Sequence, residues 1–294
     1  MARVCVVGSV NMDYTFAVSA LPRPGETVLA SALATAPGGK GANQAIAAAR
    51  AGGQVDFVGA VGSDSAGVQL LAHLRANGVG VDGVQVLPGP SGTAVIVVDA
   101  RAENAIVVAP GANGHLTMDS AAARAVVAEC DVLLLQLEIP IETAVAASRE
   151  ARAANATVVV NASPVPDALR ASGSSVPDAP GLAELAALAD VVVVNQAEAP
   201  HWRWPVEHLV VTHGADGAAY RGADGKFTIP APAVEAVDTT GAGDVFAGVL
   251  AAGWRDDRGH ALRRACAAGA LATLIPGAGD CAPRGEAIED VLQG

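Results

Sequence analysis

Residues 190–198 read DVVVVNQAE, a run of four valines that ends in polar residues. An unbroken β-branched run indicates a strand that is buried on both faces, as in a parallel sheet. Runs of the same form occur at 3–10, 55–62, 131–138, 157–163 and 208–214, and Ala-rich helical stretches occur at 41–52, 66–78 and 140–155. This alternation predicts an α/β fold, with a doubly wound, mostly parallel sheet flanked by helices on both faces.

Two segments interrupt the alternation, at residues 14–38 and 91–111. Both are strand-like and rich in turn residues, and the second is typical of a hairpin with strands near 93–99 and 104–109. We expect the two segments to form a small separate β-sheet, inserted in pieces into a single α/β domain that spans residues 1–294. Such a sheet would serve as a lid, and the alternative is an edge extension of the main sheet.

The composition excludes several classes of partner. Apolar residues make up 51% of the 294 residues and the formal net charge is −12, so a large core is available but clustered basic residues are not. We expect no nucleic-acid partner and no membrane partner, whereas phosphate ligands stay open because backbone amides can bind them. The first residues become polar too early for a signal peptide, and no uninterrupted apolar stretch is long enough to cross a membrane.

The cysteines indicate a reducing compartment, and the histidines argue against a zinc site in the protein. The four cysteines are far apart and form no C-x-x-C pair, which is typical of free thiols. The six histidines show no metal-ligand spacing. We therefore expect a soluble, cytoplasmic protein.

Polar side chains follow several of the expected strands at the point where each strand ends. Asn11 and Asp13 follow the first strand, Glu138 follows the run at 131–138, and Asn195 and Glu198 close the run of valines. Because α/β sheets bind ligands at the carboxyl ends of their strands, this edge is the expected site. The alternative is ordinary turn chemistry, since Asn and Asp favour turns.

The stretch PGGKGANQA at 37–45 resembles a P-loop only superficially. Gly41 stands where a P-loop has Ser or Thr, and Ala34 stands where its first glycine belongs. The dinucleotide fingerprint is also missing, because GSVNMD follows the first strand in its place. The glycines instead let the backbone and Asn43 approach a compact polar ligand at the start of a helix.

The stretch DTTGAGDVFAG at 238–248 combines an anion cradle with an acid. Residues 241–243 would open a helix, so their amides would face a transferring phosphoryl group. Asp244 is then suited to accept the proton of an attacking hydroxyl, a role worth about 10²–10⁴-fold in rate. The alternative is that Asp244 is only a favourable first-turn charge.

These motifs together resemble the PfkB carbohydrate kinase family, and the resemblance extends over nearly the whole chain. The matching stretches, in family order, are GSVNMD (8–13), PGGKGANQA (37–45), LLLQLEIP (133–140), NQAE (195–198), VTHGADG (211–217) and DTTGAGDVFAG (238–248). Within the family, NMD and QLE point towards the ribokinases. The resemblance implies an enzyme that transfers the γ-phosphate of ATP to the O5 hydroxyl of D-ribose, giving D-ribose 5-phosphate and ADP.

The resemblance also assigns roles to individual residues. Asp244 resembles the catalytic base, and Gly241, Ala242 and Gly243 resemble the anion hole. The sugar-binding positions, which also include Asp244, are Asn11, Asp13, Gly39, Lys40, Asn43 and Glu138. The ATP-binding positions are Asn195, Glu198, Thr212, Gly214, Asp216, Gly217 and Gly243, with Glu198 acting through Mg²⁺ and water. The positions for an activating K⁺ are Asp238, Thr240, Ala272, Ile275, Gly277 and Cys281. The family also implies a homodimer that forms through the lid.

The chain departs from the family pattern in three places. The segment 199–210 is shorter than usual, and its Trp202 and Trp204 either cover exposed core or shape a partner surface. The segment 163–181 is long and rich in Pro, Gly and Ser, which predicts a surface loop. Cys281 stands where a serine is usual, which bears on the strength of the K⁺ site.

Other functions are weighed against this one. A family kinase for adenosine would use Tyr14 or Phe16 to stack the base, whereas Asn11 and Asp13 suit hydroxyl groups. A kinase for another sugar, such as fructose, stays open, but a phosphorylated sugar would need more cations than the two lysines, Lys40 and Lys226, supply. A non-catalytic sugar-binding relative would have lost the cradle or its acid, and an NAD-dependent oxidoreductase would need the missing fingerprint loop.

Overall fold

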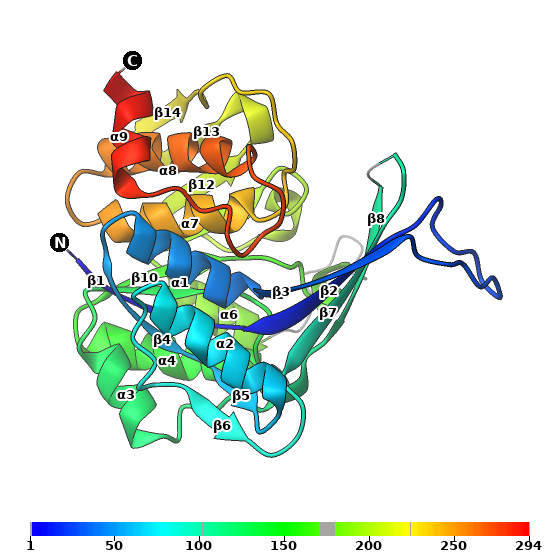
Figure 1. Cartoon of the computed structure of the whole chain (residues 1–294). Helices are drawn as coiled ribbons and strands as arrows, with labels where there is room; N and C mark the ends of the chain where they lie inside the picture. The colour runs from blue at the N-terminus through cyan, green and yellow to red at the C-terminus, as the bar shows by residue number, and fades with distance from the viewer. Residues whose placement is uncertain (1, 102, 171–179, 224, 294) are drawn as a thin grey trace.

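The main sheet has eight strands and is mostly parallel. The computed structural model describes residues 2–101, 103–170, 180–223 and 225–293 (Figure 1). The strand order is β14-β13-β12-β11-β10-β9-β1-β4, and only β13 and β14 run antiparallel to their neighbours. The strands are β1 (Arg3–Val7), β4 (Gln54–Val58), β9 (Val132–Leu135), β10 (Thr157–Asn161), β11 (Val191–Asn195), β12 (His208–Thr212), β13 (Ala218–Gly222) and β14 (Gly225–Ile229).

Helices cover both faces of this sheet, as the sequence predicts. Along β9, Val132 and Leu134 join the core beneath α1, α7 and α8, whereas Leu133 and Leu135 join the core beneath α3 and α4. Successive strand side chains point to opposite faces, so an unbroken apolar run fills both cores. The helices are α1 (Lys40–Arg50), α2 (Ser65–Ala76), α3 (Ala121–Ala128), α4 (Ile141–Ala153), α5 (Asp167–Arg170), α6 (Pro180–Leu188), α7 (Ala242–Gly253), α8 (Arg258–Ala272) and α9 (Gly285–Gln293).

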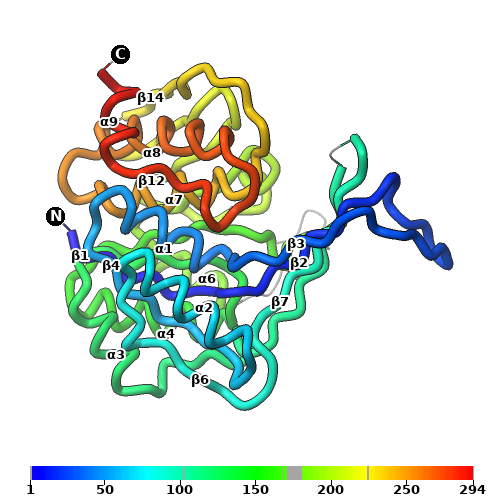
Figure 2. Tube along the Cα trace, viewed as in Figure 1, coloured from blue at the N-terminus to red at the C-terminus, as the bar shows by residue number. Residues whose placement is uncertain are grey.

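The second sheet is separate from the first and projects from the body of the molecule (Figure 2). Its strand order is β3-β2-β7-β8, and we call it the small sheet. The strands are β2 (Asn11–Ala17), β3 (Ala32–Gly38), β7 (Gly92–Val98) and β8 (Asn104–Ala109). The predicted hairpin corresponds to β7 and β8, which pair antiparallel. The alternative prediction, that these segments extend the edge of the main sheet, is therefore wrong.

Two local predictions need correction. The run at 55–62 forms two strands, because after Gly59 the chain leaves the main sheet and β5 (Ala60–Gly62) pairs with β6 (Gln85–Leu87). Part of 163–181 is helical rather than loop, since it contains α5 and the start of α6. Its residues 171–179 lie outside the described residues.

The short segment 199–210, which follows β11, covers part of the hydrophobic core, as the first of the two interpretations of its tryptophans predicts. It contains only the 3₁₀ turn η2 (Ala199–His201) before β12 begins. Trp202 packs against the core on the α3–α4 face, and its ring lies 5.3 Å from that of Trp204 in an edge-on arrangement. Among the described residues, no helix has the length and apolarity that a membrane span needs.

Candidate active site

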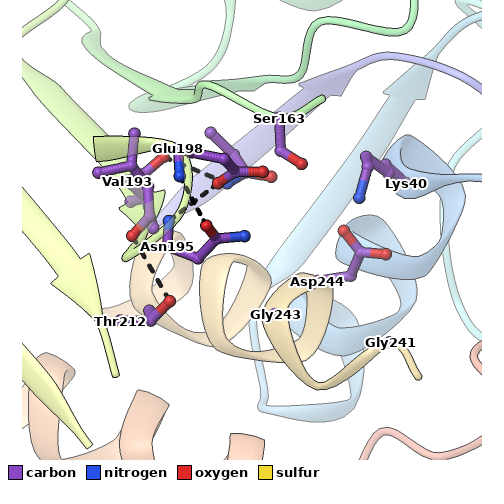
Figure 3. Close-up of a pocket in the computed structure, with 11 residues that line it drawn as sticks. Lys40, Ser163, Val193, Asn195, Glu198, Thr212, Gly241, Gly243 and Asp244 are labelled. Carbon is purple, nitrogen blue, oxygen red and sulfur yellow. Dashed lines mark hydrogen bonds between the residues drawn. The ribbon is translucent and has the colours of Figure 1, made fainter. Parts of the chain in front are cut away.

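The carboxyl edge of the main sheet meets the first turns of α1 and α7 at two adjoining cavities. The smaller has a volume of about 120 Å³ and the larger about 710 Å³. Asn195, Thr212 and Gly243 line both of them. Figure 3 shows Lys40 and Asp244 close together on one side of the smaller cavity, and Asn195 and Glu198 on the other.

Helix α7 begins with a glycine that no other residue could replace without strain. Gly241 is its N-cap with φ 79°, and a Cβ there would lie 2.8 Å from Ala278 Cα. No side chain caps the helix. The Ala242 amide donates to the Thr239 carbonyl at 3.3 Å, and the turn offers its other amide hydrogens and a positive dipole end to the cavities. A Cβ at Gly243 would meet nothing within 4 Å, which leaves open space directly over this turn.

Asp244 is buried in this first turn and is held by two amides from α1. Its Oδ2 accepts a hydrogen bond from Asn43 Nδ2 at 3.2 Å, and its Oδ1 accepts one from Gln44 Nε2 at 2.9 Å. The carboxylate is 7% exposed, so little water competes for it. A buried, oriented carboxylate beside a helix start can accept a proton from a bound hydroxyl.

The glycine pair before α1 brings its first turn against β2. Gly39 has φ 91°, and a Cβ there would lie 2.8 Å from the backbone nitrogen of Asn11. Asn11 lies at the start of β2 rather than in a turn, and its Oδ1 accepts a hydrogen bond from Asn113 Nδ2 at 2.8 Å. The close approach of the two backbones explains the glycines in PGGKG.

Three carboxylates and one lysine form a charged cluster at this junction. Burial, followed by the charges of Glu138 and Asp244, raises the pKa of Asp13 to about 7. The Asp244 carboxylate raises the pKa of Lys40 against the opposing effect of burial. Glu138 Oε2 accepts hydrogen bonds from Ser9 Oγ at 2.6 Å and from the Lys40 backbone at 3.4 Å. The cluster is therefore rich in acceptors for hydroxyl groups.

The opposite side of the site is open and fixed mainly by backbone contacts. Asn195 Oδ1 accepts from the amides of Ala197 and Glu198, and Glu198 Oε2 accepts from the Asn195 amide at 2.8 Å. A carboxylate held this way suits a magnesium ion with its water shell. The larger cavity beyond is lined mostly by small and apolar residues, including Gly214, Gly217, Ala233, Phe246 and Ala270. Asp216 is exposed on the same turn and does not line this cavity.

The six residues expected at a K⁺ site lie on two segments that Asp238 ties together. Its Oδ1 accepts from the Thr240 amide at 2.9 Å and its Oδ2 from the Gly277 amide at 2.8 Å. The Cys281 thiol lies 3.9 Å from the Thr240 carbonyl, and burial raises its pKa to about 11. Ala272 is buried at the end of α8, and its carbonyl accepts from the Ile275 amide at 3.3 Å. Carboxylate and carbonyl oxygens are the kinds of ligand that a hard cation takes, whereas a neutral thiol is only a weak acceptor.

Sequence reasoning missed the buried amides that surround the site. Gln44, Gln136 and Asn161 form a hydrogen-bonded chain to Asp244, and Asn113 holds Asn11. The signal was present in NQA (43–45) and QLE (136–138), but only Asn43 and Glu138 were assigned from these motifs, and Asn161 was not assigned at all. Within the described ranges, no group of three or more His, Cys, Asp or Glu side chains is arranged to hold a metal ion.

Comparison with known proteins gives consistent matches over the full length. The family model described as pfkB family carbohydrate kinase matches residues 1–284. The chain is 37% identical to a ribokinase of Bacillus subtilis over 297 residues, covering 99% of this chain and 100% of that one. A crystal structure of a ribokinase from Thermotoga maritima matches with a TM-score of 0.86, 29% identity and complete coverage of both chains. A structure of Arabidopsis thaliana ribokinase complexed with ribose and ATP matches with a TM-score of 0.86, 26% identity and coverage of 100% and 99%.

Proposed function

The chain belongs to the pfkB family of carbohydrate kinases, and we propose from this premise that it phosphorylates D-ribose at the O5 hydroxyl. ATP donates the γ-phosphate, and the products are D-ribose 5-phosphate and ADP. The protein is thus a phosphotransferase with an alcohol group as acceptor. One observation carries the proposal: Asp244 is buried in the first turn of α7, between a cluster of hydroxyl acceptors and the larger cavity.

The chain's own residues supply the steps of the transfer. The sugar hydroxyls bind to Asn11, Asp13, Asn43 and Glu138, with the backbone of Gly39 close beside them. Asp244 accepts the proton of the attacking hydroxyl as the O–P bond forms. The amides of Gly241, Ala242 and Gly243 and the Lys40 ammonium stabilise the charge of the transferring phosphoryl group.

The nucleotide lies along the larger cavity, whose small residues leave room for a purine. Asn195, Glu198, Thr212, Gly214 and Gly217 bind it in this proposal, whereas Asp216 is exposed, does not line the cavity and is left out of the proposed contacts. Mg²⁺, when bound near Glu198, neutralises phosphate charge. An activating K⁺ would be held by Asp238, Thr240, Ala272, Ile275, Gly277 and Cys281, where its charge would help to order the loop that precedes α7. With Cys281 in place of an oxygen ligand, activation by K⁺ is expected to be weak.

The small sheet is proposed to be both lid and dimer interface within a single kinase domain of residues 1–294. Its outer strands expose large apolar side chains, with Leu33 at 58%, Ile106 at 52% and Val107 at 69% exposure. Exposed apolar surface of this kind marks interaction sites. A lid over the sugar also excludes water during transfer. The four buried free thiols support a reducing, cytoplasmic setting.

ADP production by the purified protein tests the proposal. The assay uses ATP and Mg²⁺ with ribose, 2-deoxyribose, fructose or adenosine, each with and without K⁺. We expect turnover on ribose to exceed turnover on the other acceptors. A preference for another acceptor would keep the mechanism and change the substrate, and no turnover on any acceptor would contradict the kinase assignment.

A further inference from the structure

A chain of buried amides ends on the carboxylate of Asp244. Gln136 Nε2 donates to Gln44 Oε1 at 2.8 Å, and Gln44 Nε2 donates both to Asn161 Oδ1 at 3.1 Å and to Asp244 Oδ1 at 2.9 Å. Gln44 and Gln136 are fully buried, and Asn161 is 7% exposed. The members lie on α1, after β9, on β10 and on α7, so the chain connects four elements around the site.

A backbone carbonyl fixes the direction of every bond in this chain. Asn161 Nδ2 donates to the Val193 carbonyl at 3.2 Å, and a carbonyl can only accept. Asn161 must therefore present its Oδ1 to Gln44, and Gln44 must present its NH₂ group in return. Gln44 Oε1 then faces Gln136, which has to donate. The usual ambiguity between the two ends of an amide is absent at Gln44.

We propose that Gln44 is a positioning residue for the base Asp244, with Asn161 and Gln136 locking it as a donor. Because Gln44 can offer only hydrogens to Asp244, it fixes the position of one carboxylate oxygen, Oδ1. The other oxygen, which Asn43 contacts at 3.2 Å, is left to take the sugar proton. The inference rests on the proposed function and deepens it.

The two amide side chains of α1 that contact Asp244, Asn43 and Gln44, have different roles in this proposal. Asn43 Oδ1 is buried without a partner, so this side chain retains an acceptor for the substrate. Both ends of Gln44 are satisfied by protein groups alone, so it has nothing left for the substrate. Among the described residues, only these two side chains donate hydrogen bonds to the Asp244 carboxylate.

Charged groups around Asp244 do not replace this contact. The Asp244 charge acts through space on Lys40 of α1 and on Asp13 of β2. Glu138 after β9 acts on both of these groups, and Glu198 after β11 acts on Lys40. Cys281 faces it from the C-terminal loop as a neutral thiol. Their long-range effects persist when Gln44 is changed, so a change in the pH–rate profile can be attributed to the lost donor.

Kinetic pH profiles of four variants test the proposal on the best acceptor. Gln44→Met removes the donor at similar size, and we expect kcat to fall roughly 10–100-fold, the size associated with a lost hydrogen bond to a charged group. Gln44→Glu places a carboxylate against Asp244, so the two share a proton and the acid limb moves up by about one pH unit or more. KM for ribose and for ATP should change little in both.

The second pair of variants changes Gln136, which affects Asp244 only through Gln44. Gln136→Glu can only accept when ionised, which forces Gln44 to turn its NH₂ group away from Asp244. Gln136→Met creates no such demand. We therefore expect a larger kcat loss and a shifted acid limb for the Glu variant, although residue 136 does not touch Asp244. Ser148→Ala removes a buried hydroxyl bond inside α4, far from the site, and serves as the control.

The outcomes separate this inference from the proposed function. If the wild-type protein phosphorylates no acceptor, the proposed function fails. If it is active and folded Gln44→Met keeps both kcat and the acid limb, the positioning role is overturned. Should Gln44→Met not fold, equal kcat values and profiles for Gln136→Glu and Gln136→Met would overturn it instead. Thermal unfolding and ribose calorimetry on each variant report folding and binding independently of turnover.

Discussion

The two sides of the proposed site offer a substrate different kinds of contact. The acceptor side gathers charged and amide side chains into one partly buried cluster, which consists of Asp13, Lys40, Asn43, Glu138 and Asp244. On the nucleotide side, a cavity of about 710 Å³ is lined by small apolar residues and backbone. Hydroxyl groups need directional partners, whereas a flat aromatic base needs space and apolar contact. The acceptor side therefore depends on side-chain chemistry and the nucleotide side on shape.

Substitutions at the acceptor side should break catalysis most severely. Asp244→Ala and the size-matched Asp244→Asn remove the base, so we expect kcat to fall by about 10²–10⁴-fold. Ribose binding, measured by calorimetry, should stay largely intact because Asp13, Asn43 and Glu138 remain. Asp257→Asn is the control, since that carboxylate caps α8, where it accepts a hydrogen bond from the His260 amide. Turnover of Asp244→Asn within tenfold of the wild-type value would remove Asp244 from its role.

The boundary between the sides should be sensitive to a single methyl group. Gly243 lines both cavities and has open space over it, so Gly243→Ala should fold with an unchanged or slightly raised melting temperature. The methyl group would displace the phosphoryl group, and we expect kcat to fall roughly 100-fold, as for a misplacement of about 1 Å.

Gly253→Ala in the same helix is the opposite control for this change. Its Cβ would lie 3.1 Å from Ala261 Cβ, away from both cavities. That variant should lose stability and keep its turnover. If Gly243→Ala instead lost stability and kept turnover, the open space over α7 would have no catalytic use.

A weaker effect is expected at the nucleotide side, because few of its contacts involve charged side chains. Glu198→Gln keeps the size of the side chain but removes the charge that would attract Mg²⁺, and we expect the Mg²⁺ concentration for half-maximal rate to rise about tenfold. KM for ribose should not change. Glu207→Gln, an exposed carboxylate before β12, is the control. An unchanged Mg²⁺ dependence in Glu198→Gln would place the ion elsewhere.

The sequence predicts the strands and Asp244, but not the contacts of Gln44. Strands such as β11 are predictable because an unbroken valine run has few other uses, and Asp244 is predictable from the local pattern of glycines around it. The contacts of Gln44 are not, because they join residues 92, 117 and 200 positions apart in the chain. No periodicity encodes such pairings, which exist only after β9, β10, α1 and α7 have packed.

Edge elements were also harder to predict than central ones. The hairpin of β13 and β14 was not expected, since its residues AAYRG and GKFTI lack a continuous apolar run. The segments on either side of Gly59 were predicted as one strand, because both are apolar. The first, β4, pairs with β1 and the second, β5, pairs with β6, and no local sequence pattern indicates this change of partner. A strand that is buried on both faces has a continuous apolar run in its sequence, whereas a partly exposed strand lacks such a run and is harder to predict.

The smallest expected effect is on thermal stability, and it comes from the raised pKa of Asp13 on the acceptor side. The pKa of Asp13 is raised to about 7, so between about pH 4 and pH 7 the folded state holds a proton that the unfolded state has released. Asp13 thus favours folding at low pH, and this contribution is lost as the pH rises through 7. Asp13→Asn stays neutral, so it should melt at a higher temperature than the wild-type protein at pH 8, by roughly 2 °C or more. The difference should shrink towards pH 5.5.

Asp64→Asn provides a control of opposite sign for this measurement. A hydrogen bond from Ser91 lowers the pKa of Asp64, so its ionised form favours folding and its loss should lower the melting temperature at pH 8. Melting curves of both variants between pH 5.5 and 8.5, at fixed ionic strength and without ribose, make the comparison. If Asp13→Asn melted below the wild-type protein at pH 8, ionised Asp13 would be stabilising, and the acceptor side would not be holding its charges at a cost to the fold. If it melted higher, the same carboxylates that prepare the site for hydroxyl groups would be the ones that oppose folding, and the nucleotide side, built from small neutral residues, should show no comparable pH dependence.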